Sequence, residues 1–273
     1  MKAPRVRSLA LGSIAILLCI GMFVVIRGRK MNPEGGSSLS LYVGFAEPLE
    51  EADPRSIRYR SEFNFLRMLY SPLIGYEASG ALKSELAEDF YWKDNQAHFH
   101  IRKNAKTSLG EPVTFDDVAA SFSRLGVQQG GTHGSLLDFM CEADQATSHC
   151  LKLEKVSDTH FYIQFNGRSE FLFRLLSSMD YVIIPKRALD PKTGRIIDHT
   201  NTTGPYFLDK VSRNPNQILS ANKSHWLWNN SMPEEVEVIY NHAEKERLTP
   251  LDVVFQKLLD GKIDLIPTYA FIP

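Results

Sequence analysis

The segment Ala81–Leu125 constrains the fold more than any other part of the chain. It contains two alternating, aromatic-rich runs, Asp89–Lys93 and Ala97–Arg102, with the turn-forming residues Asp94–Gln96 between them. Alternation of apolar and polar residues is typical of half-buried strands, and a short polar turn between two such runs predicts a β-hairpin. The segment therefore indicates an antiparallel pair of strands.

A capped helix is predicted after the hairpin. The breaker Gly110–Pro112 ends the extended chain, and Thr114 then stands three residues before Asp117, which is a near match to a capping box. The residues behind this cap recur at helical spacing, at Val118, Ser121, Phe122 and Leu125. The adjacent acids Asp116 and Asp117 are better explained by capping and by the helix dipole than by acid catalysis.

The order of these motifs resembles that of the extracellular solute-binding proteins of family 5, the oligopeptide, dipeptide and nickel receptors of ABC importers. The matching residues are Leu86–Glu88, Phe99–Asn104, Gly110–Val118, Ser121–Phe122 and, further on, Thr203–Tyr206. The chain departs from the family pattern at Asn104 and Ser108–Leu109, which replace part of a usual turn, and at Phe115, where a small residue is common. The resemblance covers nearly all of residues 40–266, but only about the first half of a usual family member.

The resemblance implies an α/β fold, a type II periplasmic-binding-protein-like lobe of mixed sheet with short helices. We expect this lobe at residues 38–273, incomplete at its C-terminus. The predicted strands are Ser40–Phe45, Val156–Phe165 with a turn at its head, Tyr181–Ile184, Val236–Tyr240 and Ile263–Ile266. The predicted helices cover Phe63–Tyr70, Phe171–Leu176 and the residues from Pro250 to Leu259, with Gly261 as the stop signal of the last.

An uncharged run of 18 residues, Leu9–Ile26, is long enough as a helix to cross a bilayer, because it would span about 27 Å. Basic residues flank both ends, so charge alone does not fix its orientation. We expect residues 1–37 to form a membrane anchor and linker; a cleaved signal and a lipid anchor on Cys19 are the alternatives. The resemblance places the main domain on the periplasmic or extracellular side.

Two cysteines lie in a polar, glycine-rich stretch of the expected lobe. Eight residues separate Cys141 from Cys150. In an exported domain the pair is expected to form a disulfide, which would stabilise the fold by about 3 kcal/mol in the chain-entropy model. The alternative is two unrelated thiols.

Other chemistry has little support in the sequence. His98 and His100 share one face of a predicted strand, and His133 or His149 would complete a zinc site, but two such histidines are common without metal, so no metal is predicted. There is no G-x-S-x-G motif and no phosphate-binding glycine loop, so we expect no enzyme activity and no cofactor. The net charge of −1 gives no case for nucleic-acid binding.

The resemblance implies that a bound solute lies near the first strand and near the segment before Tyr206. The matching candidate ligand-binding residues are Tyr42, Phe45, Thr202, Thr203 and Gly204, for which strand packing and turn formation remain the alternative roles. The expected function is a membrane-tethered, extracytoplasmic solute-binding component of an ABC-type import system. The expected partners are a peptide or other small solute, the permease subunits and a second chain supplying the missing lobe. The alternative is a truncated interaction or sensory module without transport activity.

Overall fold

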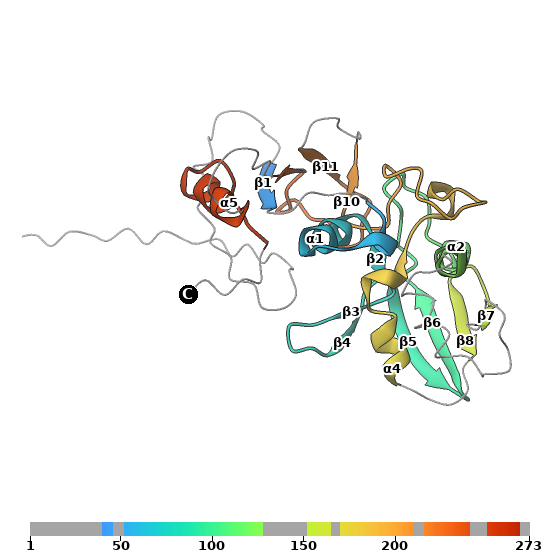
Figure 1. Ribbon diagram of the computed structural model, residues 1–273. Helices are drawn as coiled ribbons and strands as arrows, with labels where there is room; N and C mark the ends of the chain where they lie inside the picture. Colours follow the sequence, from blue (N-terminus) through green and yellow to red (C-terminus); the bar gives the residue numbers. More distant parts are fainter. Residues whose placement is uncertain are drawn as a thin grey trace, which may run out of the picture.

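The computed structural model describes residues 40–45, 52–127, 152–164, 170–209, 216–240 and 250–267. The run Leu9–Ile26 and the pair Cys141 and Cys150 lie outside these ranges, so their predicted roles stay predictions. His133 and His149, which were weighed as zinc ligands but not predicted to be so, also lie outside them. Within the described ranges, no helix is both long and apolar enough to cross a membrane. Two four-stranded sheets dominate the fold, with α1 and β2 between them (Figure 1).

The first sheet is mixed and has the strand order β1-β12-β11-β10. Strand β1 (Ser40–Phe45) runs parallel to β12 (Glu235–Tyr240), while β11 (Gln217–Ala221) is antiparallel to both β12 and β10 (Tyr206–Leu208). The predicted strands at Ser40–Phe45 and Val236–Tyr240 are therefore confirmed. We call this the mixed sheet.

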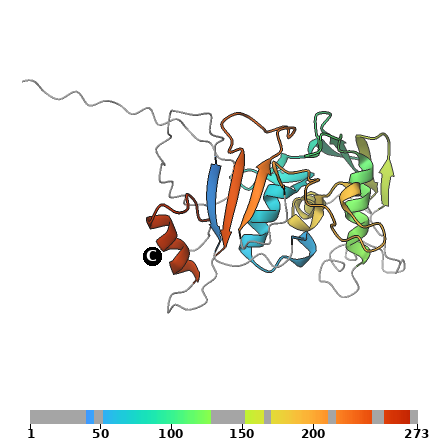
Figure 2. The ribbon, with the colours of Figure 1, turned by 90° about the horizontal axis from the view of Figure 1, so that it is seen from above.

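Helix α5 (Pro250–Leu259) lies beside β1 (Figure 2). The predicted end of this helix is confirmed, because Gly261 follows it with a φ of 71°. The predicted strand Ile263–Ile266 is wrong: only Leu265 forms a bridge, to Val43 of β1. Pro267 comes next and has no N–H to continue a ladder.

The second sheet is antiparallel throughout and has the order β5-β6-β8-β7. The predicted hairpin is confirmed as β5 (Ala87–Lys93) and β6 (Gln96–Ile101). Its turn is the dipeptide Asp94-Asn95, and both residues have positive φ, 48° and 59°, as the favoured two-residue hairpin turn requires. We call this the antiparallel sheet.

The other two strands of the antiparallel sheet are β7 (Lys152–Lys155) and β8 (His160–Gln164). The strand predicted over Val156–Phe165, with a turn at its head, corresponds to β8 and the turn before it. The backbone N–H groups of Val156 and Ser157 both bond to the His160 carbonyl, at 2.9 and 2.8 Å, which closes a turn ahead of β8. The predicted turn is therefore confirmed, and it joins β7 to β8 in an antiparallel hairpin.

Two small antiparallel pairs connect the sheets. Strand β2 (Ser71–Pro72) pairs with β9 (Val182–Ile183), and β3 (Ile74–Tyr76) pairs with β4 (Leu82–Ser84). The strand predicted at Tyr181–Ile184 is shorter than expected, because Met179–Tyr181 forms a 3-10 turn. The Ile184 N–H donates to the Ser121 hydroxyl at 2.8 Å, so this side chain occupies the position of a neighbouring strand.

In the described ranges the helices are α1 (Arg60–Leu69), α2 (Phe115–Ser123) and α4 (Glu170–Leu175), in addition to α5. The predicted capping box is confirmed at α2, where Asp117 Oδ2 accepts from the Thr114 N–H at 2.8 Å. Asp117 also accepts from the Lys186 N–H through its other oxygen, again at 2.8 Å. The carboxylate therefore holds the helix start and the chain after β9 together.

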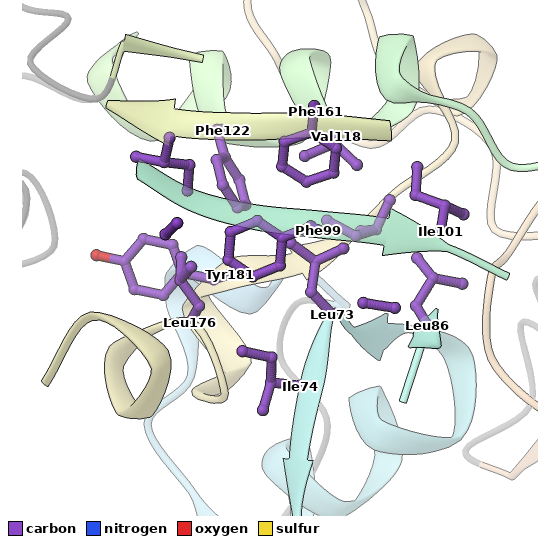
Figure 3. Close-up of a cluster of buried hydrophobic side chains, with 14 of the residues drawn as sticks. Leu73, Ile74, Leu86, Phe99, Ile101, Val118, Phe122, Phe161, Leu176 and Tyr181 are labelled. Atoms are coloured by element: carbon purple, nitrogen blue, oxygen red, sulfur yellow. The ribbon is translucent and has the colours of Figure 1, made fainter. Parts of the chain in front are cut away.

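Two large apolar clusters form the core. The first lies under the antiparallel sheet, where the Phe99 and Phe161 rings stack at 5.1 Å beside Val118 and Phe122 of α2 (Figure 3). The second lies between the mixed sheet and α1, and it includes the buried residues Leu66, Leu69, Tyr70, Val236 and Val238. A third, smaller cluster joins α5 to the mixed sheet.

Candidate solute-binding site

The predicted site segment Thr202–Gly204 lies at the junction of α1, β2, β9 and β10. The Gly204 N–H donates to the Leu69 carbonyl at the end of α1 at 2.8 Å, and Asn222 Nδ2 donates to the Gly204 carbonyl at 3.0 Å. Both polar groups of the Gly204 backbone are therefore bonded within the protein. The segment ties the start of β10 to the last turn of α1.

The side chains of Thr202 and Thr203 are completely buried. Thr203 Oγ1 accepts from the Ser71 N–H at 3.1 Å and donates to the Ile183 carbonyl at 2.5 Å, so it bridges β2 and β9. Thr202 Oγ1 donates to the Tyr206 carbonyl at 2.9 Å. The hydroxyls of both threonines thus serve bonds inside the lobe.

Glycine is required at position 204 by close contact with backbone. A Cβ atom here would lie 2.5 Å from the Leu69 carbonyl carbon and 2.5 Å from the Met68 carbonyl oxygen. Neither atom belongs to a movable side chain. Any larger residue at position 204 would push β10 away from α1.

The two candidates on β1 have different environments. Phe45 is 2% exposed and belongs to the core cluster of the mixed sheet, which also contains Leu69 and Tyr206. Tyr42 is partly buried against the α5 cluster. Its backbone is held by Asp264, whose Oδ2 accepts from the Tyr42 N–H at 3.0 Å and whose N–H donates to the Tyr42 carbonyl at 2.8 Å. The structure therefore brings Phe45 into the core that borders the Thr202–Gly204 junction, and places Tyr42 against α5.

Ser108 is a junction residue that sequence reasoning missed. Its hydroxyl accepts from the Thr202 N–H at 2.9 Å and donates to the Thr200 carbonyl at 2.6 Å, and its N–H donates to the Thr202 carbonyl at 2.9 Å. The available signal was that Ser108 departs from the usual family turn. That signal does not reveal a partner more than ninety positions away.

A buried ion cluster lies at the end of the segment that follows β1. Asp53 Oδ2 is 2.5 Å from Arg124 Nη2 and 3.1 Å from Arg55 Nη2, and all three side chains are less than a tenth exposed. Burial raises the pKa of Asp53, but the Arg124 charge and the hydrogen bonds from Arg55 and Arg124 together outweigh burial, so the pKa lies below its ordinary value. Arg124 Nε also donates to the Gly194 carbonyl at 2.9 Å, so the cluster joins three distant parts of the chain.

His98 and His100, which were weighed above as zinc ligands, lie next to a third histidine, His160. His98 Nδ1 lies 3.1 Å from His160 Nε2, and the His100 ring stacks on His160 with centroids 4.0 Å apart. His160 comes from β8, which the sequence did not place beside β6. Among the described residues, no group of three or more histidine, cysteine or acidic side chains is arranged to hold a metal ion.

Comparison with known families gives a match over most of the chain. The model of the bacterial extracellular solute-binding proteins, family 5, matches residues 81–270, which include the antiparallel sheet, the Thr202–Gly204 junction and α5. The chain belongs to this family. The motif order found in the sequence therefore identified the family correctly.

Two curated relatives show how much of a family 5 protein is present. The chain is 27% identical over 214 residues to the peptidoglycan-binding protein YepA of Agrobacterium fabrum, covering 74% of this chain and 32% of that protein. It is 26% identical over 191 residues to the periplasmic oligopeptide-binding protein OppA of Salmonella typhimurium, covering 65% of this chain and 35% of that protein. The chain thus spans about a third of the length of these relatives.

Solved structures establish the fold of the lobe. The unliganded open form of the periplasmic murein tripeptide-binding protein MppA has a TM-score of 0.70 at 19% identity, covering 86% of this chain and 46% of MppA. Haemophilus influenzae OppA, solved with the peptide RPPGFSPFR, has a TM-score of 0.68 at 19% identity, covering 86% of this chain and 47% of OppA. The predicted α/β, type II periplasmic-binding-protein architecture is therefore confirmed, with mixed sheet and short helices.

Proposed function

We propose that this chain is a solute-binding component of an ABC-type import system and that its solute is a peptide. The observation that carries the proposal is the family 5 match, which covers the whole antiparallel sheet and three of the four strands of the mixed sheet. The relatives named above bind oligopeptides, a murein tripeptide or peptidoglycan. A peptide is the solute common to the structurally similar proteins MppA and OppA.

In this proposal the predicted site residues contribute in two ways. Thr202, Thr203 and Gly204 fix the position of β10 against α1, because their polar groups are bonded within the lobe. Tyr42 and Phe45 lie on β1, the strand that borders the solute in this proposal. A substitution at the junction then weakens binding through the shape of the lobe.

The proposal extends to location and partners. Residues 1–37 hold the lobe at the membrane through Leu9–Ile26, and residues 38–273 form the lobe on the periplasmic or extracellular side. Permease subunits receive the solute. Because the chain spans less than half of the solved relatives, protein beyond these residues, such as a second chain, supplies the rest of the cleft.

One observation favours a second candidate function, an interaction or sensory module. Thr202 and Thr203 are fully buried, and the bonds of Thr202–Gly204 are all made within the lobe. A lobe whose site segment is committed to its own fold also suits an interaction or sensory module without transport activity. A direct binding measurement separates the two functions.

The test is isothermal titration of the full chain with peptides of two to nine residues. Free amino acids of the same composition serve as the matched control. Saturable binding of peptides, with weaker or no binding of the amino acids, supports the proposal. If neither class binds and the unfolding temperature is unchanged by excess peptide, this chain does not bind peptides by itself, and either the interaction module or a cleft completed by a second chain becomes the better explanation.

A further inference from the structure

The outer face of the antiparallel sheet carries three histidines in two adjoining cross-strand rows. In one row the register places Tyr91, His98, Tyr162 and Glu154 opposite one another. In the next row it places Asp89, His100 and His160 opposite one another. Phe99 and Phe161 alternate with these residues and point into the core. We call His98, His100 and His160 the histidine face.

The three imidazole rings are packed against one another. His98 Nδ1 and His160 Nε2 are 3.1 Å apart, and the His100 and His160 rings stack with centroids at 4.0 Å and an interplanar angle of 17°. The Tyr91 ring covers His98, stacked at 5.1 Å and 5°. His98 is 7% exposed, and its Nε2 has no hydrogen-bond partner.

This geometry limits how many protons the pair of His98 and His160 can hold. A 3.1 Å contact between ring nitrogens requires one N–H and one lone pair. A single imidazolium can donate to a neutral imidazole, so one extra proton is compatible with the contact. With two extra protons both nitrogens carry hydrogen, the bond is lost, and two like charges face each other. At least one of the two histidines must therefore stay neutral while this contact is intact.

The surrounding groups favour the neutral state. Burial lowers the pKa of His98, Lys93 and His100 lower it further, and only Asp94 acts in the opposite direction. Burial also lowers the pKa of His160, as do the neighbouring His100 and His98. The register places further ionisable groups on this face of the four strands: the carboxylates Asp89 and Glu154 at the ends of the two rows, the phenols of Tyr91 and Tyr162, and Lys93 and Lys152 at the ends of the adjoining row.

We propose that the histidine face makes the antiparallel sheet sensitive to acid: the sheet is held by neutral imidazoles and loosens when a second proton enters the His98–His160 pair. A histidine kept neutral in the fold but free to charge in the unfolded chain destabilises the fold as the pH falls below about 6.5. For one such histidine, the unfolding equilibrium constant rises by up to about 25-fold between pH 7 and pH 5. The inference is independent of the proposed function, because it concerns only the stability of the sheet.

The test is urea unfolding of the full chain between pH 5 and pH 7.5, comparing the wild type with His160→Gln. Glutamine keeps a polar side chain but does not titrate. His199 and His225, whose pKa values burial also lowers, are present in both proteins, so their contributions cancel. We expect the acid-induced rise in the unfolding constant to be about 20-fold smaller in the variant. Equal rises in the two proteins would overturn the inference.

Two further measurements keep the test decisive if the variant does not fold. Hydrogen exchange of the wild type, corrected for intrinsic rates, should show that β6 and β8 lose protection at pH 5 before β1 and β12 do. Ring-proton NMR of the wild type should show His98 and His160 titrating in two separate steps. Uniform loss of protection in both sheets, or two independent titrations near pH 6.5, would contradict the proposal.

Discussion

Replacing Gly204 with alanine should destabilise the lobe by about 3 kcal/mol. The added Cβ would lie 2.5 Å from backbone atoms of Met68 and Leu69, whereas ordinary contact begins at 3.4 Å, so the two segments must part by the difference, about 0.9 Å. That shift would lengthen the 2.8 Å bond from the Gly204 N–H to the Leu69 carbonyl beyond hydrogen-bonding range. The cost combines overpacking with the loss of one buried backbone bond.

The assay is urea unfolding of the full chain followed by tryptophan fluorescence, with linear extrapolation to water. The matched control is Gly80→Ala, because Gly80 has a φ of +82° and a methyl group added there would meet no atom within 4 Å. There we expect only the cost of a strained backbone, about 1 kcal/mol. A Gly204→Ala protein within 0.5 kcal/mol of the wild type, or more stable than the Gly80 control, would refute the close-packed junction.

Three other predictions concern the buried hydroxyl of Thr203, the buried carboxylate of Asp53 and the cysteine pair. Thr203→Val should lower the free energy of unfolding by about 2 kcal/mol, measured in urea, because the Ser71 N–H and the Ile183 carbonyl lose their bonds to the hydroxyl. Thr203→Ser keeps the hydroxyl and should cost only about 1 kcal/mol. A larger loss for serine than for valine would contradict the bridge that Thr203 forms between β2 and β9. Asp53→Asn should cost about 3–5 kcal/mol by leaving two buried guanidinium groups unpaired. Glu111→Gln, at an exposed ion pair with Arg187, should cost less than about 1 kcal/mol; equal losses at the two sites would argue against burial as the cause. Cys141→Ser should lose about 3 kcal/mol only when the wild type is oxidised, which thiol alkylation and mass measurement will show.

Local signals in the sequence were sufficient for the elements whose geometry depends on neighbouring residues. The hairpin turn at Asp94-Asn95 needs positive φ at both positions, which asparagine and aspartate tolerate, and its residue types predicted it. The capping box of Thr114 and Asp117 was predictable because both partners lie within one turn of the helix. The family could be recognised because such local features occur in a characteristic order.

Features that depend on distant partners could not be predicted from local patterns. The strand predicted at Tyr181–Ile184 is shortened by Ser121, whose hydroxyl exchanges two bonds with Ile184 across 63 positions. The Thr202–Gly204 segment was predicted as a ligand contact, but its bonds to Ser71, Ser108 and Asn222 could not be foreseen from the sequence. No spacing rule in the sequence brings these side chains together.

For the histidine face, too, the local pattern was predictable and the contact with a distant residue was not. Alternation along β6 predicted that His98 and His100 share one face, and the structure confirms it, because Phe99 and Ile101 are buried on the other. The position of His160 depends on the register of β8 against β6. A turn ahead of β8 was predicted, but no local pattern in the sequence set which strand β8 pairs with, so that register was not predictable.

The most direct test of the solute-binding account is native mass spectrometry of the full chain, purified in mild detergent from an oxidising compartment without stripping bound molecules. The account predicts a population with added mass that matches a short peptide and that disappears when the protein is unfolded and refolded. A bare monomer, or a self-associated species with no added mass after incubation with peptides, would contradict solute binding by this chain.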